Sequence, residues 1–341
     1  MTSDLAPRDG YPGELDLLKL GWHSKLSMDL YLADPGVSSS ILKLQGEAPA
    51  LAKAALDRTL DNGDTQASME GELIHTALLE PDDLEARYVV GGDCEAELGS
   101  GLRKGQACGA AGHAIHPDVG WVCGRHGAKH LDPPRQVVVN SAQMRMAFAI
   151  RDNALIPGRP LHHPAAKQLL QQAGEAELTG IFTDPETGER GRIRLDRWLE
   201  LGWSLDVKTV DVGRGHANKF VRHAWNRGMH VQQGWYRHGA HVLDREVARH
   251  VILVAERGYP YLVQPYLLPP ELVTAGEQEA LANLRALAHC RETGEWPGYS
   301  TELVELELLG WQKAQLQKEP AERAGAEEAA SPDVQGFGLF D

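Results

Sequence analysis

The chain has 341 residues, of which 42% are hydrophobic and four are cysteines. This composition excludes disordered, collagen-like and disulfide-rich secreted proteins, and it supplies enough apolar material for a hydrophobic core. At about 150 residues per domain, the length suits two domains or one domain with an insertion. The formal net charge of −14 argues at first against a nucleic-acid partner, because phosphate binding depends mainly on Lys and Arg.

The sequence carries no sign of membrane insertion or secretion. No stretch approaches the run of about 18 apolar residues that spans a membrane, and the first residues lack the basic and apolar regions of a secretory signal. We therefore expect a cytoplasmic protein with no membrane partner. Because cytoplasmic thiols stay reduced, a cysteine cluster would be a metal site rather than a pair of disulfides.

The predicted elements follow an irregular arm at residues 1–37, which are rich in Pro, Gly and Asp. Helical periodicity predicts helices that start at Ser38 and that cover residues 68–79, 141–153 and 165–173. Alternating apolar residues then predict a three-stranded antiparallel meander at residues 175–183, 190–199 and 203–209. The remaining predicted elements are helices at 216–227 and 230–243, strands at 251–255 and 261–268, and a long helix at 271–292.

Two segments stand apart from this pattern. Residues 91–135 are rich in glycine, hold three of the four cysteines and show little apolar periodicity, so we expect an inserted module there. Residues 312–341 turn to Glu, Ala, Gln and Pro and are predicted to be a disordered acidic tail. Residues 336–341 at its end combine two Phe with an Asp and are a candidate docking tip for a partner protein, although most such tails bind nothing.

Asp206 and Lys208 are the first chemically informative pair. Side chains alternate between the two faces of a strand, so these two share one face while Leu205 and Val207 share the other. If Asp196 lies on the neighbouring strand, two carboxylates converge beside one lysine. Such carboxylates bind Mg²⁺, and a metal and a lysine together stabilise charge on a phosphodiester. Taken alone, Asp-x-Lys is more often a weak ion pair on a strand surface.

Further motifs occur in a characteristic order around this pair. They are Gly71-Glu-Leu-Ile-His75 on a helix, Glu177, Gly191-Arg-Ile-Arg-Leu-Asp196, Asp206-Val-Lys-Thr209 and Gln232-Gln-Gly-Trp-Tyr236. The series resembles the motifs of the PD-(D/E)xK nuclease superfamily. Among its branches, the series is most similar to the RecB-type module of RecE (exonuclease VIII) and its phage relatives. The resemblance covers residues 38–296.

The resemblance implies a restriction-endonuclease-like α/β (α+β) core, with a mixed central sheet flanked by helices, over residues 38–90 and 136–311. It implies catalytic Mg²⁺ or Mn²⁺ held by Asp196, Asp206, the Val207 carbonyl and His75, with Lys208 and Glu177 as further catalytic residues. It also implies that Gln232 and Tyr236 contact DNA or order the site, and that Arg192 and Arg194 contact DNA. Without the family context, His75 is an ordinary helix histidine, and Gln232 and Tyr236 are ordinary helix packing.

The implied activity is a Mg²⁺-dependent exodeoxyribonuclease that degrades linear double-stranded DNA in the 5′→3′ direction and leaves single strands for homologous recombination. The resemblance further implies a ring-like homo-oligomer, binding to double-stranded DNA ends and a single-strand-annealing partner protein. Two alternatives stay open: an endonuclease or structure-specific nuclease of the same fold, and a catalytically idle DNA-binding or assembly module. The presence of Asp196, Asp206 and Lys208 together argues against idleness.

The glycine-rich segment contains a set of candidate zinc ligands. Cys94, Cys108, Cys123 and His126 follow the spacing C-x13-C-x14-C-x2-H. This spacing predicts a structural Zn²⁺ in a Cys₃His site, because a segment with so few apolar residues needs a metal to fold. The competing ligands are His113, His116 and His130, and the alternative is a flexible loop with free thiols. Cys290, in the late helix, is predicted to be a core residue.

The charge is unevenly distributed along the sequence. Residues 61–100 hold eleven acidic residues and one basic residue, whereas residues 190–257 hold thirteen Lys or Arg against seven Asp or Glu. The basic segment contains the Asp-x-Lys strand and the helices after it. The acidic total therefore does not exclude DNA, and binding is predicted to be confined to one basic groove.

Overall fold

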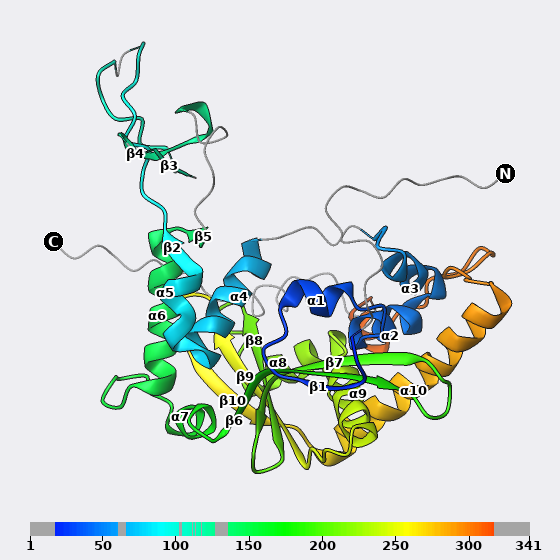
Figure 1. The fold of residues 1–341 in the computed structure, drawn as a ribbon. Helices are drawn as coiled ribbons and strands as arrows, with labels where there is room; N and C mark the ends of the chain where they lie inside the picture. Colours follow the sequence, from blue (N-terminus) through cyan, green and yellow to red (C-terminus); the bar gives the residue numbers. More distant parts are fainter. Residues whose placement is uncertain are drawn as a thin grey trace. The chain divides into compact units, whose positions relative to one another are not determined.

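The structure is a computed structural model, and it describes residues 18–60, 66–101, 104–110, 112, 114–116, 118–126 and 136–316. The chain divides into two units, Met1–Pro297 and Gly298–Asp341. In the described part of the first unit, six strands form one mixed sheet that helices flank (Figure 1). The described helices include none with the length and apolar character of a membrane span.

The central sheet has the strand order β1-β6-β7-β8-β9-β10. Its strands are β1 (Gly21–His23), β6 (Gly174–Thr183), β7 (Arg190–Leu199), β8 (Trp203–Val210), β9 (Arg249–Glu256) and β10 (Val263–Leu267). β6, β7 and β8 form the predicted antiparallel meander, whereas β8 and β9 run parallel. A parallel neighbour needs a long crossover, and the predicted helices α8 (Ala217–Asn226) and α9 (Met229–Val242) supply it.

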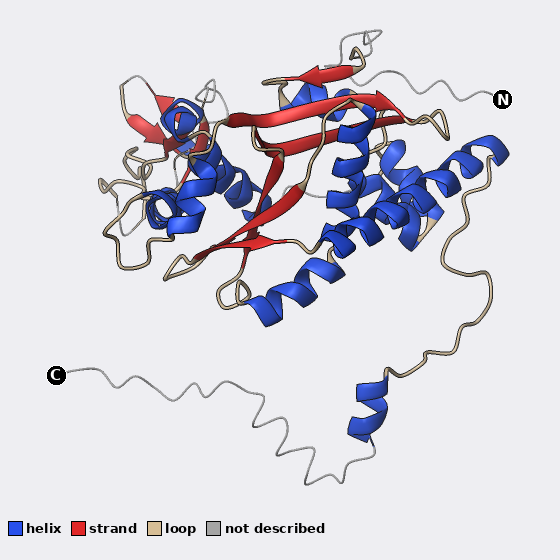
Figure 2. Cartoon of the chain, turned by 90° about the horizontal axis from the view of Figure 1, so that it is seen from below, coloured by secondary structure: helices blue, strands red, loops and turns tan. Residues whose placement is uncertain are grey.

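Helices lie on both sides of the sheet (Figure 2). One group, α2 (Ser39–Glu47), α9 and α10 (Pro270–Thr293), packs with β6 and β7 around the buried Phe182 and Trp235. Another group, α4 (Gln66–Leu79), α6 (Ser141–Leu155) and α7 (Pro164–Leu170), packs with β8, β9 and β10. Leu205 and Val207 are fully buried in this second cluster, as the strand alternation predicted.

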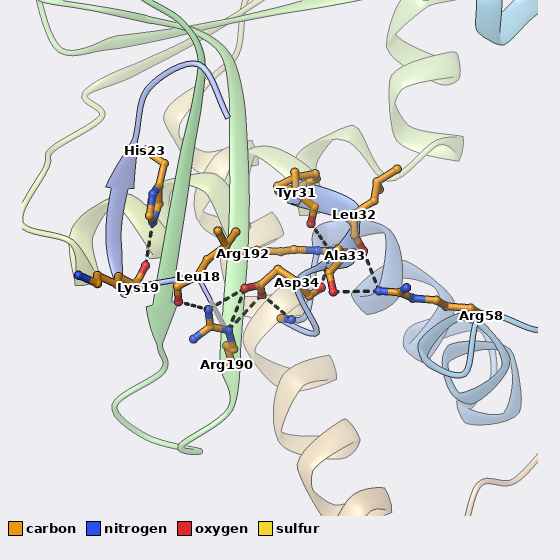
Figure 3. Close-up of polar contacts among 11 residues, drawn as sticks. Leu18, Lys19, His23, Tyr31, Leu32, Ala33, Asp34, Arg58, Arg190 and Arg192 are labelled. Atoms are coloured by element: carbon orange, nitrogen blue, oxygen red, sulfur yellow. Dashed lines mark hydrogen bonds and ion pairs between the residues drawn. The ribbon is translucent and has the colours of Figure 1, made fainter. Parts of the chain in front are cut away.

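The N-terminal region is more ordered than its sequence predicted. Within residues 18–37, β1 pairs antiparallel with β6, and α1 (Met28–Ala33) follows it. Two arginines of β7 hold this segment (Figure 3): Arg190 pairs with the buried Asp34, and Arg192 donates hydrogen bonds to the carbonyl oxygens of Tyr31, Leu32 and Asp34. The prediction of an irregular arm is therefore wrong for these residues, because their partners lie 156 to 161 residues away in the sequence. Residues 1–17 lie outside the described part.

The predicted insertion leaves and rejoins the fold through two neighbouring strands. β2 (Tyr88–Val90) and β5 (Val137–Val139) pair in parallel at its two ends. Between them, the described residues include an antiparallel hairpin of β3 (Ala114–His116) and β4 (Gly120–Val122), followed by the short 3-10 turn η2 (Gly124–His126). Because the two ends of the segment are adjacent, a module can be inserted here without separating the elements of the main fold.

Shorter helices account for further differences from the predictions. α3 (Pro49–Leu56) follows α2, η1 (Pro81–Asp83) and α5 (Leu84–Arg87) follow α4, and α11 (Gly310–Leu316) belongs to the second unit. α11 overlaps the predicted disordered tail, so that prediction is wrong for residues 312–316. The Gln312 side chain accepts a hydrogen bond from the Leu309 N–H and so caps the helix start. Residues 317–341, including the candidate docking tip, lie outside the described part.

α9 and α10 cross with their backbones in contact at two glycines. A Cβ on Gly234 would lie 2.1 Å from the Glu277 nitrogen, and a Cβ on Gly276 would lie 2.0 Å from the His230 oxygen. No side chain can occupy such a short gap to backbone atoms, so both positions require glycine. The crossing fixes the position of α9 against the sheet.

Gly276→Ala is expected to lower the free energy of unfolding by about 2 to 3 kcal/mol, because the added methyl group forces the two helices apart. Urea unfolding followed by circular dichroism measures the loss. Gly71→Ala in α4 is the matched control: its nearest neighbour would be the Thr209 hydroxyl at 3.7 Å, and alanine improves helix propensity by up to about 1 kcal/mol. Equal stability of the two variants would contradict the close crossing.

Candidate active site and Cys-His metal centre

A cleft of about 2180 Å³ opens among α1, α2, α4 and α8 over the strands β6, β7 and β8. Its lining, as far as the structure describes it, contains twelve Lys or Arg residues and six Asp or Glu residues. The chain as a whole is acidic, so the basic side chains are concentrated here. A concave surface of this charge attracts a polyanion, as the sequence predicted for one groove.

The floor of the cleft is formed where β7 and β8 separate. The two strands pair only between Arg197–Leu199 and Trp203–Leu205. Past that point, the Val207 N–H has no strand partner and instead donates a hydrogen bond of 2.7 Å to Asp196 Oδ2. A buried N–H group needs an acceptor, so the separation of the strands draws the Asp196 carboxylate to this position.

His75, Glu177 and Asp196 gather at this point, and their ligand atoms lie within 4.8 Å of one another. His75 comes from α4, and its Nε2 donates to the Val207 carbonyl at 2.9 Å. This hydrogen bond leaves the lone pair on Nδ1, which lies 3.6 Å from Asp196 Oδ2. The imidazole is therefore held in the tautomer that can bind a metal through Nδ1.

Glu177 occupies an unusual backbone conformation. The β6–β7 register places it opposite Asp196, between the pairs Ala176–Arg197 and Leu178–Leu195. Its φ of +53° lies in the left-handed region, which costs about 1 kcal/mol or more for a residue with a side chain. Its carboxylate also forms an ion pair with Arg194. Strain of this kind, maintained beside two other candidate ligands, is typical of a functional site.

The carboxylates of this group repel one another. Burial, with repulsion from Asp206, raises the pKa of Asp196 to about 7. Burial, with repulsion from Asp196, raises the pKa of Glu177. A divalent cation fits this group, because it would offset the crowded negative charge and accept two carboxylate oxygens and one imidazole nitrogen.

The buried Asp206 and the partly exposed Lys208 form an ion pair beside this group. The Lys208 ammonium lies 2.5 Å from Asp206 Oδ2, and the Asp206 side chain is 1% exposed. Burial lowers the pKa of Lys208, but Asp206 and Asp196 outweigh it and raise the pKa overall. The neighbouring carboxylates therefore favour the charged form of Lys208.

Gln232 of α9 contacts the other oxygen of Asp206, and Tyr236, one turn further along the helix, contacts Gln232. Gln232 Nε2 donates to Asp206 Oδ1 at 3.1 Å and to the Tyr236 hydroxyl at 2.8 Å. Their predicted role, to contact DNA or to order the site, stays a prediction. The Asp206 carboxylate does not join the His75, Glu177 and Asp196 group among the described residues, and its role as a metal ligand, like that of the Val207 carbonyl, stays a prediction.

Arg192 and Arg194 line the cleft but also form contacts inside the protein, and their role in DNA contact stays a prediction. The Arg192 residue is 8% exposed, and its guanidinium is occupied by the carbonyl groups at the end of α1. Arg194 pairs with Glu177 and donates to the Leu26 carbonyl at 2.9 Å. Because side chains alternate along β7, both arginines point to the side of α1. There their guanidinium groups donate hydrogen bonds to the carbonyl oxygens of Tyr31 and Leu26.

The insertion brings its predicted ligands together. Cys94 Sγ and Cys123 Sγ lie 3.3 and 3.5 Å from His126 Nδ1, and Cys108 Sγ completes a group within 4.8 Å. Burial raises the pKa of Cys123, but hydrogen bonds from the Arg125 and His126 N–H groups outweigh it and lower the pKa to about 6. A thiolate is therefore available near neutral pH, and three sulfurs with one nitrogen suit a tetrahedral Zn²⁺.

Of the other candidate ligands, His116 lies among the described residues and does not join this group. His116 lies on β3, and its Nδ1 accepts a hydrogen bond from the Asp118 N–H at 3.2 Å. His113 and His130 lie outside the described residues. Cys290 is buried in α10, which confirms its predicted place in the core.

Comparison with known proteins places the chain in a family. A family profile for the "PDDEXK-like domain of unknown function (DUF3799)" matches residues 38–307. The chain belongs to this family. Membership in the PDDEXK-like family confirms the predicted superfamily and fold class, and it supports a nuclease.

Other comparisons add little about this PDDEXK-like protein. No curated protein matches its sequence. A solved structure from Eubacterium rectale, provisionally described as an exonuclease, is similar with a TM-score of 0.49 and 12% sequence identity, over 87% of this chain and 100% of that one. A similarity of this size carries no conclusion about activity.

Two cleft residues of this PDDEXK-like protein were missed by sequence reasoning. Lys43 of α2 and Arg227 at the end of α8 both line the cleft with Lys208. A lysine on a half-buried helix face is common, because its long stem covers apolar surface while its head stays in water. The local sequence around Lys43 therefore gives no signal, and only the tertiary structure brings it near Lys208.

A buried polar network behind α9 makes stability depend on pH. His250 Nδ1 lies 2.9 Å from the Ser204 hydroxyl and 3.0 Å from Gln233 Oε1. Burial lowers the pKa of His250 from 6.5 to about 4, so the folded state keeps it neutral at pH values where the unfolded chain protonates it. Stability contributed by this difference is present above pH 6.5 and is lost as the pH falls toward 4.

Lowering the pH from about 7.5 to about 5 is expected to remove about 2 kcal/mol of unfolding free energy through His250. Urea unfolding at both pH values, on the wild type and on His250→Gln, isolates the contribution of this residue. The variant should lose about 2 kcal/mol less than the wild type over this range. The same pH dependence in both proteins would show that His250 is not the group responsible.

Proposed function

We propose that this protein is a metal-dependent deoxyribonuclease that degrades linear double-stranded DNA from its ends. One observation carries the proposal: His75, Glu177 and Asp196 gather within 4.8 Å beside the Asp206–Lys208 pair, in a cleft whose lining has twice as many basic as acidic side chains. Carboxylates that hold a metal next to a lysine suit hydrolysis of a phosphodiester, and a basic cleft suits a polyanionic substrate.

The site residues have different proposed roles in the reaction. His75, Glu177 and Asp196 would hold Mg²⁺ or Mn²⁺, with Asp206 as a further ligand that the motif resemblance implies. The metal, when bound, activates water and offsets phosphate charge. The Lys208 ammonium stabilises the negative charge that develops on the phosphate oxygens. Gln232 and Tyr236 keep Asp206 aimed at Lys208 through their hydrogen bonds.

Finer features of the proposal rest on the motif resemblance alone. They are 5′→3′ polarity, a role in homologous recombination, a ring-like homo-oligomer, a single-strand-annealing partner and a cytoplasmic location. We also propose the domain division, with nuclease segments at residues 38–90 and 136–311 around an insertion at 91–135. The adjacent β2 and β5 at the two ends of the insertion support that division.

For the insertion, we propose that Cys94, Cys108, Cys123 and His126 hold a structural Zn²⁺. The separations of 3.3 and 3.5 Å between sulfur and nitrogen suit two ligands of one tetrahedral ion. The small core around this group consists of Cys94, Ala114, Val122 and Cys123. So little apolar surface cannot hold a fold together without a metal.

The nuclease proposal is tested with end-labelled linear duplex DNA and closed circular duplex DNA of the same sequence. With Mg²⁺ or Mn²⁺, we expect the full-length protein to degrade the linear DNA progressively and to leave the circle intact, and a chelator should stop the reaction. Cleavage of the circle would identify an endonuclease instead. No cleavage of either DNA with either metal would refute the nuclease.

A further inference from the structure

Lys43 lies beside Lys208 in the cleft but belongs to neither candidate metal group. It comes from α2, Lys208 comes from β8, and Arg227 follows the last residue of α8, so three separate elements bring three cations to one region. The Lys43 ammonium donates a hydrogen bond of 3.3 Å to the Arg227 carbonyl. This contact joins α2 to the turn between α8 and α9.

The turn between α8 and α9 is shaped to hold the Lys43 side chain. Gly228 has a φ of +58°, and a Cβ there would lie 2.7 Å from Lys43 Cδ. The aliphatic stem of Lys43 thus passes directly over the glycine, and the carbonyl of the preceding residue receives its ammonium. Because both the stem and the head are held, the charge is positioned rather than freely mobile.

Lys43 has no ion-pair partner in the part of the chain that the structure describes. Among the described residues, the hydrogen bond to the Arg227 carbonyl is its polar contact, and no carboxylate forms an ion pair with it. Burial and the nearby Lys208 lower the pKa of Lys43, and Asp206 partly opposes them. Cations that are held close together in a cleft repel one another unless an anion lies between them.

We propose that Lys43 and Arg227 form a phosphate-binding site beside Lys208, and that this site holds an internal phosphodiester of the DNA strand next to the one that is cleaved. The inference rests on the proposed nuclease function and deepens it. Lys43 supplies a charge-assisted hydrogen bond to a phosphate oxygen, and so it orients the strand without taking part in bond cleavage. The Gly228 turn makes this contact depend on α8 and α9 keeping their relative positions.

The test measures binding of the full-length protein to a linear duplex labelled with a fluorophore. Fluorescence anisotropy in Ca²⁺, or with a chelator, separates binding from cleavage. Lys43→Met is the informative variant, because methionine keeps an aliphatic stem over Gly228 and removes the charge. Lys53→Met is the matched control: Lys53 lies on α3, outside the cleft lining, and pairs with Asp57 on the surface.

Lys43→Met is expected to weaken DNA binding about tenfold. It should also reduce the slope of log Kd against log salt concentration by the amount that corresponds to about one phosphate contact. Lys53→Met should change neither the affinity nor the slope. Lys43→Arg should retain the salt slope. The loss of affinity should be the same for duplexes with 5′-phosphate and with 5′-hydroxyl ends. A loss seen only with the 5′-phosphate would show that Lys43 binds the terminal phosphate, not an internal phosphodiester.

The outcomes separate this inference from the nuclease proposal. If the wild type cleaves DNA and Lys43→Met binds with wild-type affinity and salt slope, the phosphate site is refuted and the nuclease stands. If the wild type binds DNA without cleaving it and Lys43→Met loses the phosphate contact, the nuclease fails and the binding site stands. Urea unfolding of each variant shows whether its fold is intact, and Lys43→Gln replaces Lys43→Met if that variant is unfolded.

Discussion

Asp196→Asn is expected to reduce cleavage of linear duplex DNA by about 10³-fold or more while DNA binding persists. The substitution removes the charge of a carboxylate that lies within 4.8 Å of His75 and Glu177 and keeps its shape. Loss of a metal ligand removes both the activation of water and the electrostatic stabilisation of the phosphate, which are among the largest contributions to catalysis. Single-turnover cleavage of an end-labelled duplex measures the effect.

Lys208→Met is the companion variant, with an expected loss of about 10²- to 10³-fold in the rate of the chemical step. It leaves Asp206 buried without its cation, so urea unfolding must accompany the kinetics. Asp57→Asn and Lys53→Met, which alter an exposed ion pair on α3, are the matched controls and should cleave at the wild-type rate. Full activity of both Asp196→Asn and Lys208→Met would show that the cleavage site lies elsewhere.

Removal of the metal from the insertion is the second large effect that we expect. The purified chain should contain about one Zn²⁺, and a strong chelator should unfold the insertion while the central sheet persists. Structural Zn²⁺ sites in small modules contribute roughly 10 to 16 kcal/mol of apparent binding free energy, far more than the few buried side chains of this segment supply. Hydrogen exchange at β3 and β4 would report the loss of structure.

Two cysteine variants test the ligand assignment. Cys123→Ser should abolish stoichiometric zinc, because it replaces a thiolate whose pKa is lowered to about 6. Cys290→Ser alters a buried thiol in α10 and should keep the zinc. Elemental analysis of the two purified variants distinguishes them. If the wild-type chain contains no zinc after expression and refolding in the presence of Zn²⁺, the Cys₃His site is ruled out.

Most of the elements that carry the candidate site could be predicted from the amino-acid sequence. β6, β7 and β8 agree with the predicted strands to within one residue at each end, because the alternation of apolar and polar residues is a local property of a half-buried strand. The same alternation correctly predicted that Leu205 and Val207 lie in the core. The spacing of Cys94, Cys108, Cys123 and His126 likewise predicted a group that the fold brings together.

Which of these side chains come into contact depends on the folded arrangement of the strands and helices. Asp196 occupies its position because β7 and β8 separate and leave the Val207 N–H without a strand partner, and no local pattern marks that point. Arg192 donates hydrogen bonds to carbonyl groups of α1, whose residues lie about 160 positions earlier in the sequence, and no local pattern predicts this contact. Local periodicity sets the direction of a side chain, whereas its partner depends on the free energy of packing and hydrogen bonding over the whole fold.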